Sequence, residues 1–261
     1  MTHKMLKIKK IINEAKGLKS FVFEHDLKAK PGQFVIVWIP RLDEKPFGVS
    51  YQNNKKFAIT VSAVGEFSKA MHKLKVGDLV GIKGPFGSCF NIEGKRIALV
   101  AGGYGAAPLA FLADEAVKQK KKVYFIIGAQ NKDYILYEER FKDSKVNLHM
   151  CTDDGTKGEK GFTTDILKDL LKKKKIDKIF SCGPEIMMKF VLKLAEANNI
   201  DIELTLERYM KCGGGLCGQC CVDPTGWRVC VEGPVFNKEK IKQIKEFANY
   251  KRAKSGKKVK L

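Results

Sequence analysis

The stretch Arg96-Ile-Ala-Leu-Val-Ala-Gly-Gly-Tyr-Gly-Ala-Ala-Pro108 joins an apolar run to a glycine-rich turn. The run, residues 96–101, is typical of a strand buried in a parallel sheet. A helix is predicted over residues 108–120, with its apolar side chains on one stripe. The turn between them would place a phosphate-bearing ligand at the helix N-terminus, where N–H groups favour anions. The candidate residues are Gly102, Gly103, Gly105 and Pro108, although they depart from the Gly-x-Gly-x-x-Gly pattern and tight packing is the alternative explanation.

Strands and helices continue to alternate after this turn. Strands are predicted at residues 123–128, 146–151 and 178–182. One helix would be capped by Thr163 or Thr164 and run to residue 171. Another would start with Pro184 in its first turn and carry Ile186, Met187, Phe190, Val191 and Leu194. The alternation predicts an α/β domain with a parallel sheet.

Two polar segments follow predicted strands of this sheet. They are Thr152-Asp153-Asp154-Gly155 and Ser181-Cys182-Gly183-Pro184. Open α/β sheets bind ligands at the carboxyl edge, where both segments would lie, so they strengthen the prediction of a nucleotide site. Cys182 taken alone is explained as well by a small buried hydrophobic residue.

The first ninety residues contain short β-rich runs separated by turns. The runs are residues 7–12, 18–23, 34–39, 57–64 and 79–83, with a short helix at 68–74. Closely spaced strands without helical periodicity predict an antiparallel barrel or sandwich. Two other segments are by themselves ordinary turns: Lys45-Pro46-Phe47-Gly48-Val49-Ser50-Tyr51 and Gly65-Glu66-Phe67-Ser68.

Five of the eight cysteines lie between residues 212 and 230. Cys212, Cys217 and Cys220 have the C-x4-C-x2-C spacing of a plant-type [2Fe–2S] cluster, and Cys230 is the fourth candidate ligand. Structural zinc is the alternative, but zinc sites more often use two separated C-x2-C pairs. Cys221 is one position beyond the spacing, so we expect it to be a spectator. Clustered thiols in an intracellular chain indicate metal rather than disulfides.

The part of the chain after about residue 205 is too small for a large core of its own, and bound metal would stabilise it. A closing helix is predicted over residues 237–250, with Ile241, Ile244 and Ala248 facing inward. Residues 251–261 are expected to form a frayed basic tail.

Composition excludes several classes of protein. No apolar run is long enough to span a membrane, and the N-terminus lacks the apolar core of a secretory signal, so a cytoplasmic protein is expected. The net charge is +20, but only six of the 49 basic residues are arginines. Recognition of nucleic acid favours arginine, and no basic stripe is interleaved with aromatic residues. We therefore expect no nucleic-acid partner.

Together these motifs resemble the ferredoxin–NAD(P) reductase superfamily over nearly the whole chain. The resemblance implies a multidomain β plus α/β fold: a flavin-binding antiparallel barrel (residues 1–93), a nicotinamide-binding α/β domain (94–203) and a small [2Fe–2S] domain (204–261). The segments Glu207-Arg208-Tyr209-Met210-Lys211-Cys212 and Cys230-Val-Glu-Gly-Pro-Val-Phe236 resemble one family in it more closely. That family is the electron-transfer subunits of class 1B dihydroorotate dehydrogenase.

The resemblance assigns cofactor roles to the motifs. An Arg-Pro-x-Ser-like strand holds the FAD ring system, matched here by Lys45, Pro46, Phe47 and Gly48. Lys45 replaces the usual arginine; Gly48 stands where a hydroxyl residue is usual, with Ser50 two positions on. Gly65 and Ser68 match the flavin phosphate turn. The nicotinamide residues are Gly102, Gly103, Gly105, Pro108, Cys182, Gly183 and Pro184, and the cluster ligands are Cys212, Cys217, Cys220 and Cys230.

The resemblance also implies the function of the chain. In that family dihydroorotate is oxidised at FMN in a separate catalytic subunit, in de novo synthesis of the pyrimidine UMP. Electrons cross one [2Fe–2S] cluster to one FAD per electron-transfer subunit and then reduce NAD+. Two catalytic and two electron-transfer subunits form a heterotetramer. The chain alone should not oxidise dihydroorotate, and it carries no catalytic residue for that step.

Two alternatives remain open from the sequence. One is a reductase subunit of a hydrogenase, a sulfide dehydrogenase or a ferredoxin:NADP oxidoreductase, which would use the same cofactors. The other is a zinc- or cluster-bearing nucleic-acid-binding protein, which would bind no flavin. The choice of NAD or NADP also stays open, because Gln130, Asn131 and Lys132 do not decide it.

Overall fold

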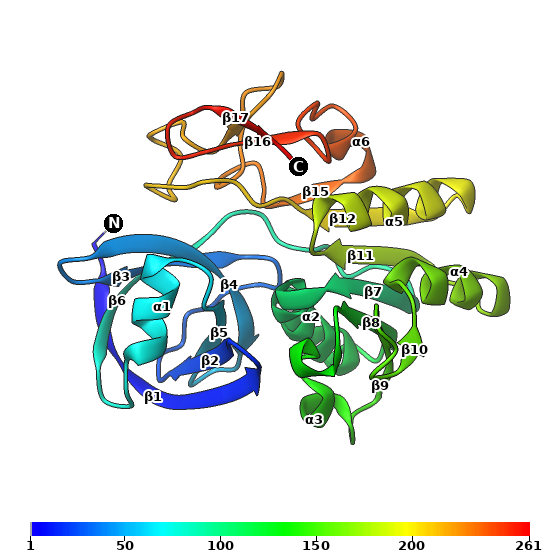
Figure 1. The fold of residues 1–261 in the computed structure, drawn as a ribbon, viewed down its shortest axis with the longest axis horizontal. Helices are drawn as coiled ribbons and strands as arrows, with labels where there is room; N and C mark the ends of the chain where they lie inside the picture. The colour runs from blue at the N-terminus through cyan, green and yellow to red at the C-terminus, as the bar shows by residue number, and fades with distance from the viewer. Residues whose placement is uncertain (1) are drawn as a thin grey trace.

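Six antiparallel strands close into a barrel in the computed structural model, which describes residues 2–261 (Figure 1, lower left). The strand order around the barrel is β1-β2-β5-β4-β3-β6. Alternating apolar side chains such as Ile8, Phe21 and Phe57 fill its interior, and helix α1 (Glu66–Lys73) buries Phe67 and Met71 against it. The strands are β1 (Lys4–Ala15), β2 (Leu18–Phe23), β3 (Phe34–Ile39), β4 (Asp43–Gln52), β5 (Phe57–Ser62) and β6 (Leu79–Phe86).

A seven-stranded sheet follows the barrel, in the order β10-β9-β8-β7-β11-β12-β15. Its strands are β7 (Arg96–Gly102), β8 (Lys122–Ala129), β9 (Val146–Thr152), β10 (Glu159–Lys160), β11 (Lys178–Cys182), β12 (Asp201–Thr205) and β15 (Val235–Asn237). The helices of this part are α2 (Ala106–Lys118), α3 (Glu138–Phe141), α4 (Thr163–Lys173) and α5 (Glu185–Ala197), with short 3-10 turns at Gly103–Gly105 and Lys132–Tyr134. All neighbouring strands are parallel except β12 and β15.

The C-terminal part lies above both other parts (Figure 1). It contains β13 (Cys221–Val222), β14 (Trp227–Arg228), α6 (Lys238–Ile241) and a hairpin of β16 (Tyr250–Arg252) and β17 (Lys258–Lys260). Its strand β15 extends the central sheet, with Phe236 opposite Leu204. The apolar core of this part is therefore continuous with the core of the α/β part.

Polar contacts join the barrel to the α/β part. Arg140 donates through both terminal nitrogens to the carbonyl of Ser50, at 3.1 Å, and pairs with Asp114 at 2.6 Å. The hydroxyls of Tyr137 and Thr60 are 2.6 Å apart. These contacts hold strand β4 against helix α2, and they therefore fix the position of the barrel relative to the α/β part.

The fold class expected from the sequence is confirmed, with several local corrections. Residues 45–51 form part of strand β4 rather than a turn, because β3 and β5 pair with it on both sides. Helix α4 starts at Thr163 and has Phe162 at its N-cap, where Asp165 accepts from the Phe162 N–H at 3.1 Å, so neither threonine is the cap.

Helix α5 buries Met188, Val191, Leu192 and Ala195. Of the apolar residues named from the sequence, Val191 is buried and Met187 and Leu194 pack, partly buried, against the same core. Ile186 and Phe190 are exposed. The helix is apolar over more than one face, so periodicity did not identify the buried side.

The C-terminal residues also differ from expectation. The helix predicted over 237–250 ends at Ile241, and the chain continues in turns, although Ile241, Ile244 and Ala248 are all buried as predicted. The expected frayed tail is the ordered β16–β17 hairpin. Over residues 2–261, none of the helices is long and apolar enough to cross a membrane.

Candidate functional site

A cleft of about 730 Å³ opens where the three parts meet. Strands β4 and β5 and helix α1 supply its barrel wall, and the start of α2, the end of β11 and the segment after β12 supply the opposite wall. The volume lies within the usual range for small-molecule and cofactor sites. Residues from the sequence prediction that line it are Lys45, Pro46, Phe47, Gly48, Gly65, Ser68, Gly105, Pro108 and Cys182.

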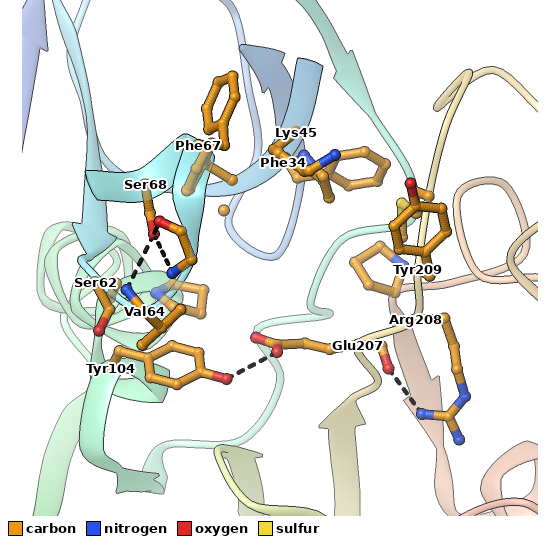
Figure 2. A pocket seen from close by; sticks show the side chains of 18 of the residues that line it. Phe34, Lys45, Ser62, Val64, Phe67, Ser68, Tyr104, Glu207, Arg208 and Tyr209 are labelled. Atoms are coloured by element: carbon orange, nitrogen blue, oxygen red, sulfur yellow. Dashed lines mark hydrogen bonds between the residues drawn. The ribbon is translucent and has the colours of Figure 1, made fainter. Parts of the chain in front are cut away.

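The β4 segment presents an apolar surface with one cation at its edge. Phe47 stacks on Phe67 with ring centroids 5.9 Å apart. Gly48 faces Pro108 across the cleft, and a Cβ there would be 3.7 Å from the proline Cβ, in ordinary contact. The ammonium of Lys45 pairs with Asp43 and lies 5.5 Å from the centre of the Tyr209 ring (Figure 2).

Ser50 is not brought to the cleft. It is buried in the barrel wall, where its hydroxyl accepts a hydrogen bond from Thr60 at 3.1 Å. Residues two apart on a strand share a face, but the β4–β5 pairing is irregular between Val49 and Tyr51. Ser50 therefore does not replace the hydroxyl that Gly48 lacks.

Ser68 shapes the turn before α1. Its Oγ accepts from the N–H groups of Val64 and Gly65 at 3.0 and 2.9 Å, and can donate to the Gly65 carbonyl at 3.1 Å (Figure 2). The first N–H groups of a helix have no partner within it, and Gly65 provides no capping side chain. These N–H groups can therefore bind a phosphate at the cleft wall.

The nicotinamide motif and the Cys-Gly-Pro segment lie against each other at the ends of β7 and β11. A Cβ at Gly105 would be 2.3 Å from the carbonyl oxygen of Cys182, so only glycine fits there. Gly102 and Gly183 are likewise in contact, and Pro184 packs on Gly102. Gly103 has open space around it. The glycines thus allow the ends of β7 and β11 to pack closely, and they also form one edge of the cleft.

A tyrosine–carboxylate pair crosses the floor of the cleft. Tyr104 Oη donates to Glu207 Oε2 at 3.0 Å, joining the glycine turn to the segment after β12 (Figure 2). Glu207 is open to the cleft, but the surrounding protein reduces its hydration and raises its pKa, although the Tyr104 hydrogen bond acts in the opposite direction. Burial, reinforced by the nearby Glu207 charge, raises the pKa of the Cys182 thiol to about 12. Cys182 is therefore a neutral thiol in this cleft.

Arg208 points away from the cleft into a buried ion-pair cluster. Its Nε donates to Glu246 at 2.9 Å and its Nη1 donates to Glu185 at 2.6 Å. Glu246 also accepts from the Asp223 N–H at 3.0 Å. The cluster ties the segment that leads to the cysteines to helix α5 and to the C-terminal part.

The four predicted ligand cysteines lie on a glycine-rich loop and a following turn. Gly213, with a φ of 69°, packs so close to the barrel that a Cβ would be 2.8 Å from Ile36. Cys220 and Cys230 are buried, Cys212 is half-buried and Cys217 is exposed. Met210, which lines the cleft, precedes Cys212 by two residues, so no more than about 7 Å of chain separates them.

The cysteines approach one another in two pairs. The Cys212 and Cys217 thiols lie close enough to affect each other's ionisation, and so do the Cys220 and Cys230 thiols. Burial opposes ionisation of Cys212, but N–H groups of Cys217, Gly214 and Leu216 point at its sulfur and bring its pKa to about 7. Over residues 2–261, no three Cys, His, Asp or Glu side chains gather around one point as a single ion requires. Two thiol pairs with N–H groups aimed at sulfur fit a two-iron centre better than zinc.

Cys221 does not join either pair. Its side chain is half-buried beside the loop, in strand β13, and burial raises its pKa. Its backbone pairs with Arg228 of β14 instead.

The sequence prediction omitted several residues of the cleft: Tyr104, Glu207, Tyr209 and Lys254. Tyr104 stands inside the glycine motif, and Glu207 and Tyr209 stand just before the first cluster cysteine, so their positions were a usable signal. No sequence signal indicated Lys254, because its segment is distant in sequence from the other cleft residues and was expected to be frayed.

The fold and the two cofactor regions define a class of protein. Barrel, parallel sheet and cysteine loop meet at one cleft, the organisation of a ferredoxin–NADP reductase-type oxidoreductase with an added iron–sulfur domain. The family model described as "Oxidoreductase NAD-binding domain" matches residues 99–193. The model described as "Iron-sulfur cluster binding domain of dihydroorotate dehydrogenase B" matches residues 207–242.

Curated relatives give the family. A protein of Methanocaldococcus jannaschii, named "Probable dihydroorotate dehydrogenase B (NAD(+)), electron transfer subunit", is 50% identical over 254 residues, covering 97% of this chain and 96% of the relative. A protein of the same name from Methanothermobacter thermautotrophicus is 43% identical, covering 98% and 96%. The chain belongs to the family of dihydroorotate dehydrogenase B electron transfer subunits.

Solved structures agree with this assignment at the level of fold. A chain from the structure of an NADH-dependent reduced ferredoxin-NADP oxidoreductase superposes with a TM-score of 0.82 at 30% identity, covering 92% of this chain and 90% of that chain. The flavohem-like FAD/NAD binding domain of Vibrio cholerae nitric oxide dioxygenase superposes with a TM-score of 0.65 at 20% identity, covering 78% and 98%.

Proposed function

We propose that this chain transfers electrons between a [2Fe–2S] cluster and NAD+ through FAD bound in the central cleft. The observation that carries the proposal is the meeting of three parts at one site. The strand, turn and helix elements of a flavin site face the glycine motif, and the segment that lines the cleft leads directly into Cys212. A flavin is needed there because it exchanges single electrons with a cluster and a hydride with nicotinamide.

The proposed contacts of the flavin follow from the cleft walls. Pro46, Phe47 and Gly48 offer an apolar surface for the ring system. Lys45 and the free N–H groups in the first turn of α1 would bind its phosphates. Gly65 leaves the turn open, with nothing within 4 Å of where a Cβ would stand.

We propose that the nicotinamide nucleotide enters over the ends of β7 and β11. Gly102, Gly103, Gly105, Pro108, Cys182, Gly183 and Pro184 form that edge. The Cys182 thiol and the Tyr104–Glu207 pair would lie near the nicotinamide and orient it. Because the thiol is neutral and the Glu207 carboxyl is held by Tyr104, neither would bring a mobile charge to the ring. Cys212, Cys217, Cys220 and Cys230 would hold the cluster.

The proposed partner is an FMN-containing catalytic subunit that oxidises dihydroorotate, assembled as a heterotetramer of two subunits of each kind in the cytoplasm, for pyrimidine synthesis. The names of the relatives support a partner, since an electron transfer subunit implies a catalytic one. Leu216, 91% exposed beside the exposed Cys217, offers an apolar contact at the cluster.

Reconstitution tests this assignment. The chain is mixed with the FMN-containing subunit encoded in the same genome, and reduction of NAD+ by dihydroorotate is measured. We expect activity from the mixture and none from this chain alone. Activity of the chain alone, or a mixture that reduces artificial dyes but never NAD+, would contradict the proposal.

A second candidate partner has support of its own. The 30% identical structural relative belongs to a reduced ferredoxin-NADP oxidoreductase, so a ferredoxin-linked complex is the competing assignment. Purification of the native complex separates the two: an FMN-containing subunit active on dihydroorotate supports the first, and a partner active on reduced ferredoxin supports the second.

A further inference from the structure

The C-terminal hairpin is fastened to the C-terminal part by ion pairs and a hydrogen bond. Tyr250 donates to Asp223 at 2.9 Å, and Lys258 lies 3.5 Å from the same carboxylate. Arg252 lies 3.6 Å from the buried Glu246. With both strands held in this way, the tip of the hairpin reaches the central cleft, where Lys254 is part of the lining.

Acidic side chains outnumber the basic side chains that face the cleft. The acids of the lining are Asp43, Glu66 and Glu207. The bases are Lys45, Arg208 and Lys254, but the Arg208 side chain points away from the cleft. Without Lys254 the excess of negative charge would be larger. Such a surface would repel the two negative charges of a dinucleotide diphosphate.

Two of these cations are already committed to carboxylates. Lys45 is paired with Asp43, and Arg208 is paired with Glu246 and Glu185. Among residues 2–261, Arg252 and Lys258 of the hairpin also have carboxylate partners, whereas Lys254 has none within ion-pair distance. Lys254 is thus an exposed ammonium in the cleft lining, close to Asp43.

We propose that Lys254 binds the diphosphate of FAD, so that the C-terminal hairpin is part of the flavin site. The inference rests on the proposed function, because it takes FAD as the occupant of the cleft. Charge-assisted hydrogen bonds to phosphate are among the stronger hydrogen bonds. Because Asp43 already neutralises part of the Lys45 charge, Lys254 would supply the remaining positive charge for the diphosphate. The N–H groups in the first turn of α1 supply the neutral donors.

Flavin binding to the FAD-depleted full chain tests the proposal. Dissociation constants for FAD and for riboflavin, which lacks phosphate, are measured by flavin fluorescence. We expect Lys254→Ala to weaken FAD binding about 5- to 20-fold and to leave riboflavin binding unchanged. Lys254→Arg should bind FAD nearly as the unaltered chain does. Higher salt should weaken FAD binding less in Lys254→Ala than in the unaltered chain.

Lys257→Ala is the matched control, since Lys257 lies in the same turn but does not line the cleft. Circular dichroism and cluster absorbance show whether each variant is folded. Equal loss of FAD and riboflavin binding, equal effects of the two alanine variants, or no effect of Lys254→Ala would overturn the inference and leave the proposed function intact. An unaltered chain that binds no FAD would overturn both.

Discussion

Cys220 and Cys221 are neighbours in sequence, but only Cys220 is placed to hold a cluster. Cys220 is buried beside Cys230, whereas Cys221 lies in β13 outside the thiol pairs. We expect Cys220→Ser to lose the visible absorbance and the iron of the cluster. Cys221→Ser should retain both.

Iron and sulfide analysis of anaerobically purified protein checks this pair of variants. Loss of the cluster in Cys221→Ser, with Cys220→Ser intact, would assign the ligands differently.

Close packing leaves no room for a side chain at position 105, where the chain has glycine. An added Cβ would be 2.3 Å from the backbone oxygen of Cys182, so β11 or the turn after β7 must shift. We expect Gly105→Ala to lower the free energy of unfolding by about 1–3 kcal/mol. Gly48→Ala, whose Cβ would make only ordinary contact, should be neutral or slightly stabilising.

Thermal unfolding of the flavin-free forms measures both substitutions. Equal melting temperatures for Gly105→Ala and the unaltered chain would show that the two strand ends are not closely packed.

Glu207 should make stability depend on pH. Burial raises the pKa of this carboxyl above its ordinary value of 4.5, so between the unfolded and folded pKa values the folded state binds more protons. The free energy of unfolding should therefore fall as the pH rises from about 4.5 through the folded pKa. Tyr104→Phe removes a hydrogen bond that favours the carboxylate, and should move this fall to higher pH.

Chemical unfolding at several pH values measures this effect. Glu207→Gln should lack the fall. Parallel pH profiles for Glu207→Gln and the unaltered chain would contradict the assignment.

At the scale of elements, one buried ion-pair cluster joins the α/β part to the cysteine-bearing part. Arg208 has a side chain 2% exposed, and its partner Glu246 is 0% exposed. Removing the arginine leaves a buried carboxylate without its cation, so we expect Arg208→Leu to cost about 3–5 kcal/mol of stability. Lys172→Ala, which breaks an exposed pair with Asp169, should cost no more than about 0.5 kcal/mol.

Denaturant unfolding of the two variants gives the comparison. Similar small losses for both would mean that the Arg208 cluster does not fix the C-terminal part.

The elements that the sequence predicted best are those with a strong period or an unbroken apolar run. Strands β2, β3 and β11 have the predicted bounds. Strand β4 was implied only by the family resemblance and not by local propensity, because Pro46 and Gly48 are both unfavourable in strands and its outer face is charged. Its pairing with β3 and β5 is a long-range effect that local propensity does not contain.

The candidate cluster cysteines and the glycine motif could be proposed from the sequence because each has a characteristic spacing. The other residues of the cleft could not be predicted, because they come from segments that are distant in sequence. Tyr104 and Glu207 are 103 positions apart and meet only through the sheet. The β16–β17 hairpin is held by Asp223 and Glu246, and a run of lysines alone gave no sign of that support.

At the scale of the whole molecule, three parts of different fold share one cleft. The barrel supplies the proposed flavin surface, the α/β sheet supplies the nicotinamide edge, and the C-terminal part places the cysteine loop against the barrel at Ile36. The net charge of +20 is spread over many lysines and does not by itself define a partner surface. This arrangement supports the proposal that electrons pass between nicotinamide, flavin and cluster within this single chain.

Anaerobic titration of the purified chain with NADH tests that claim most directly. Flavin absorbance and the electron paramagnetic resonance of the cluster are followed together, after FAD, iron and sulfide have been quantified. The account predicts one FAD, two irons and two sulfides per chain, with flavin bleaching and a reduced [2Fe–2S] signal appearing as NADH is added. A chain that contains zinc and no flavin, or a cluster that NADH never reduces through bound FAD, would contradict it.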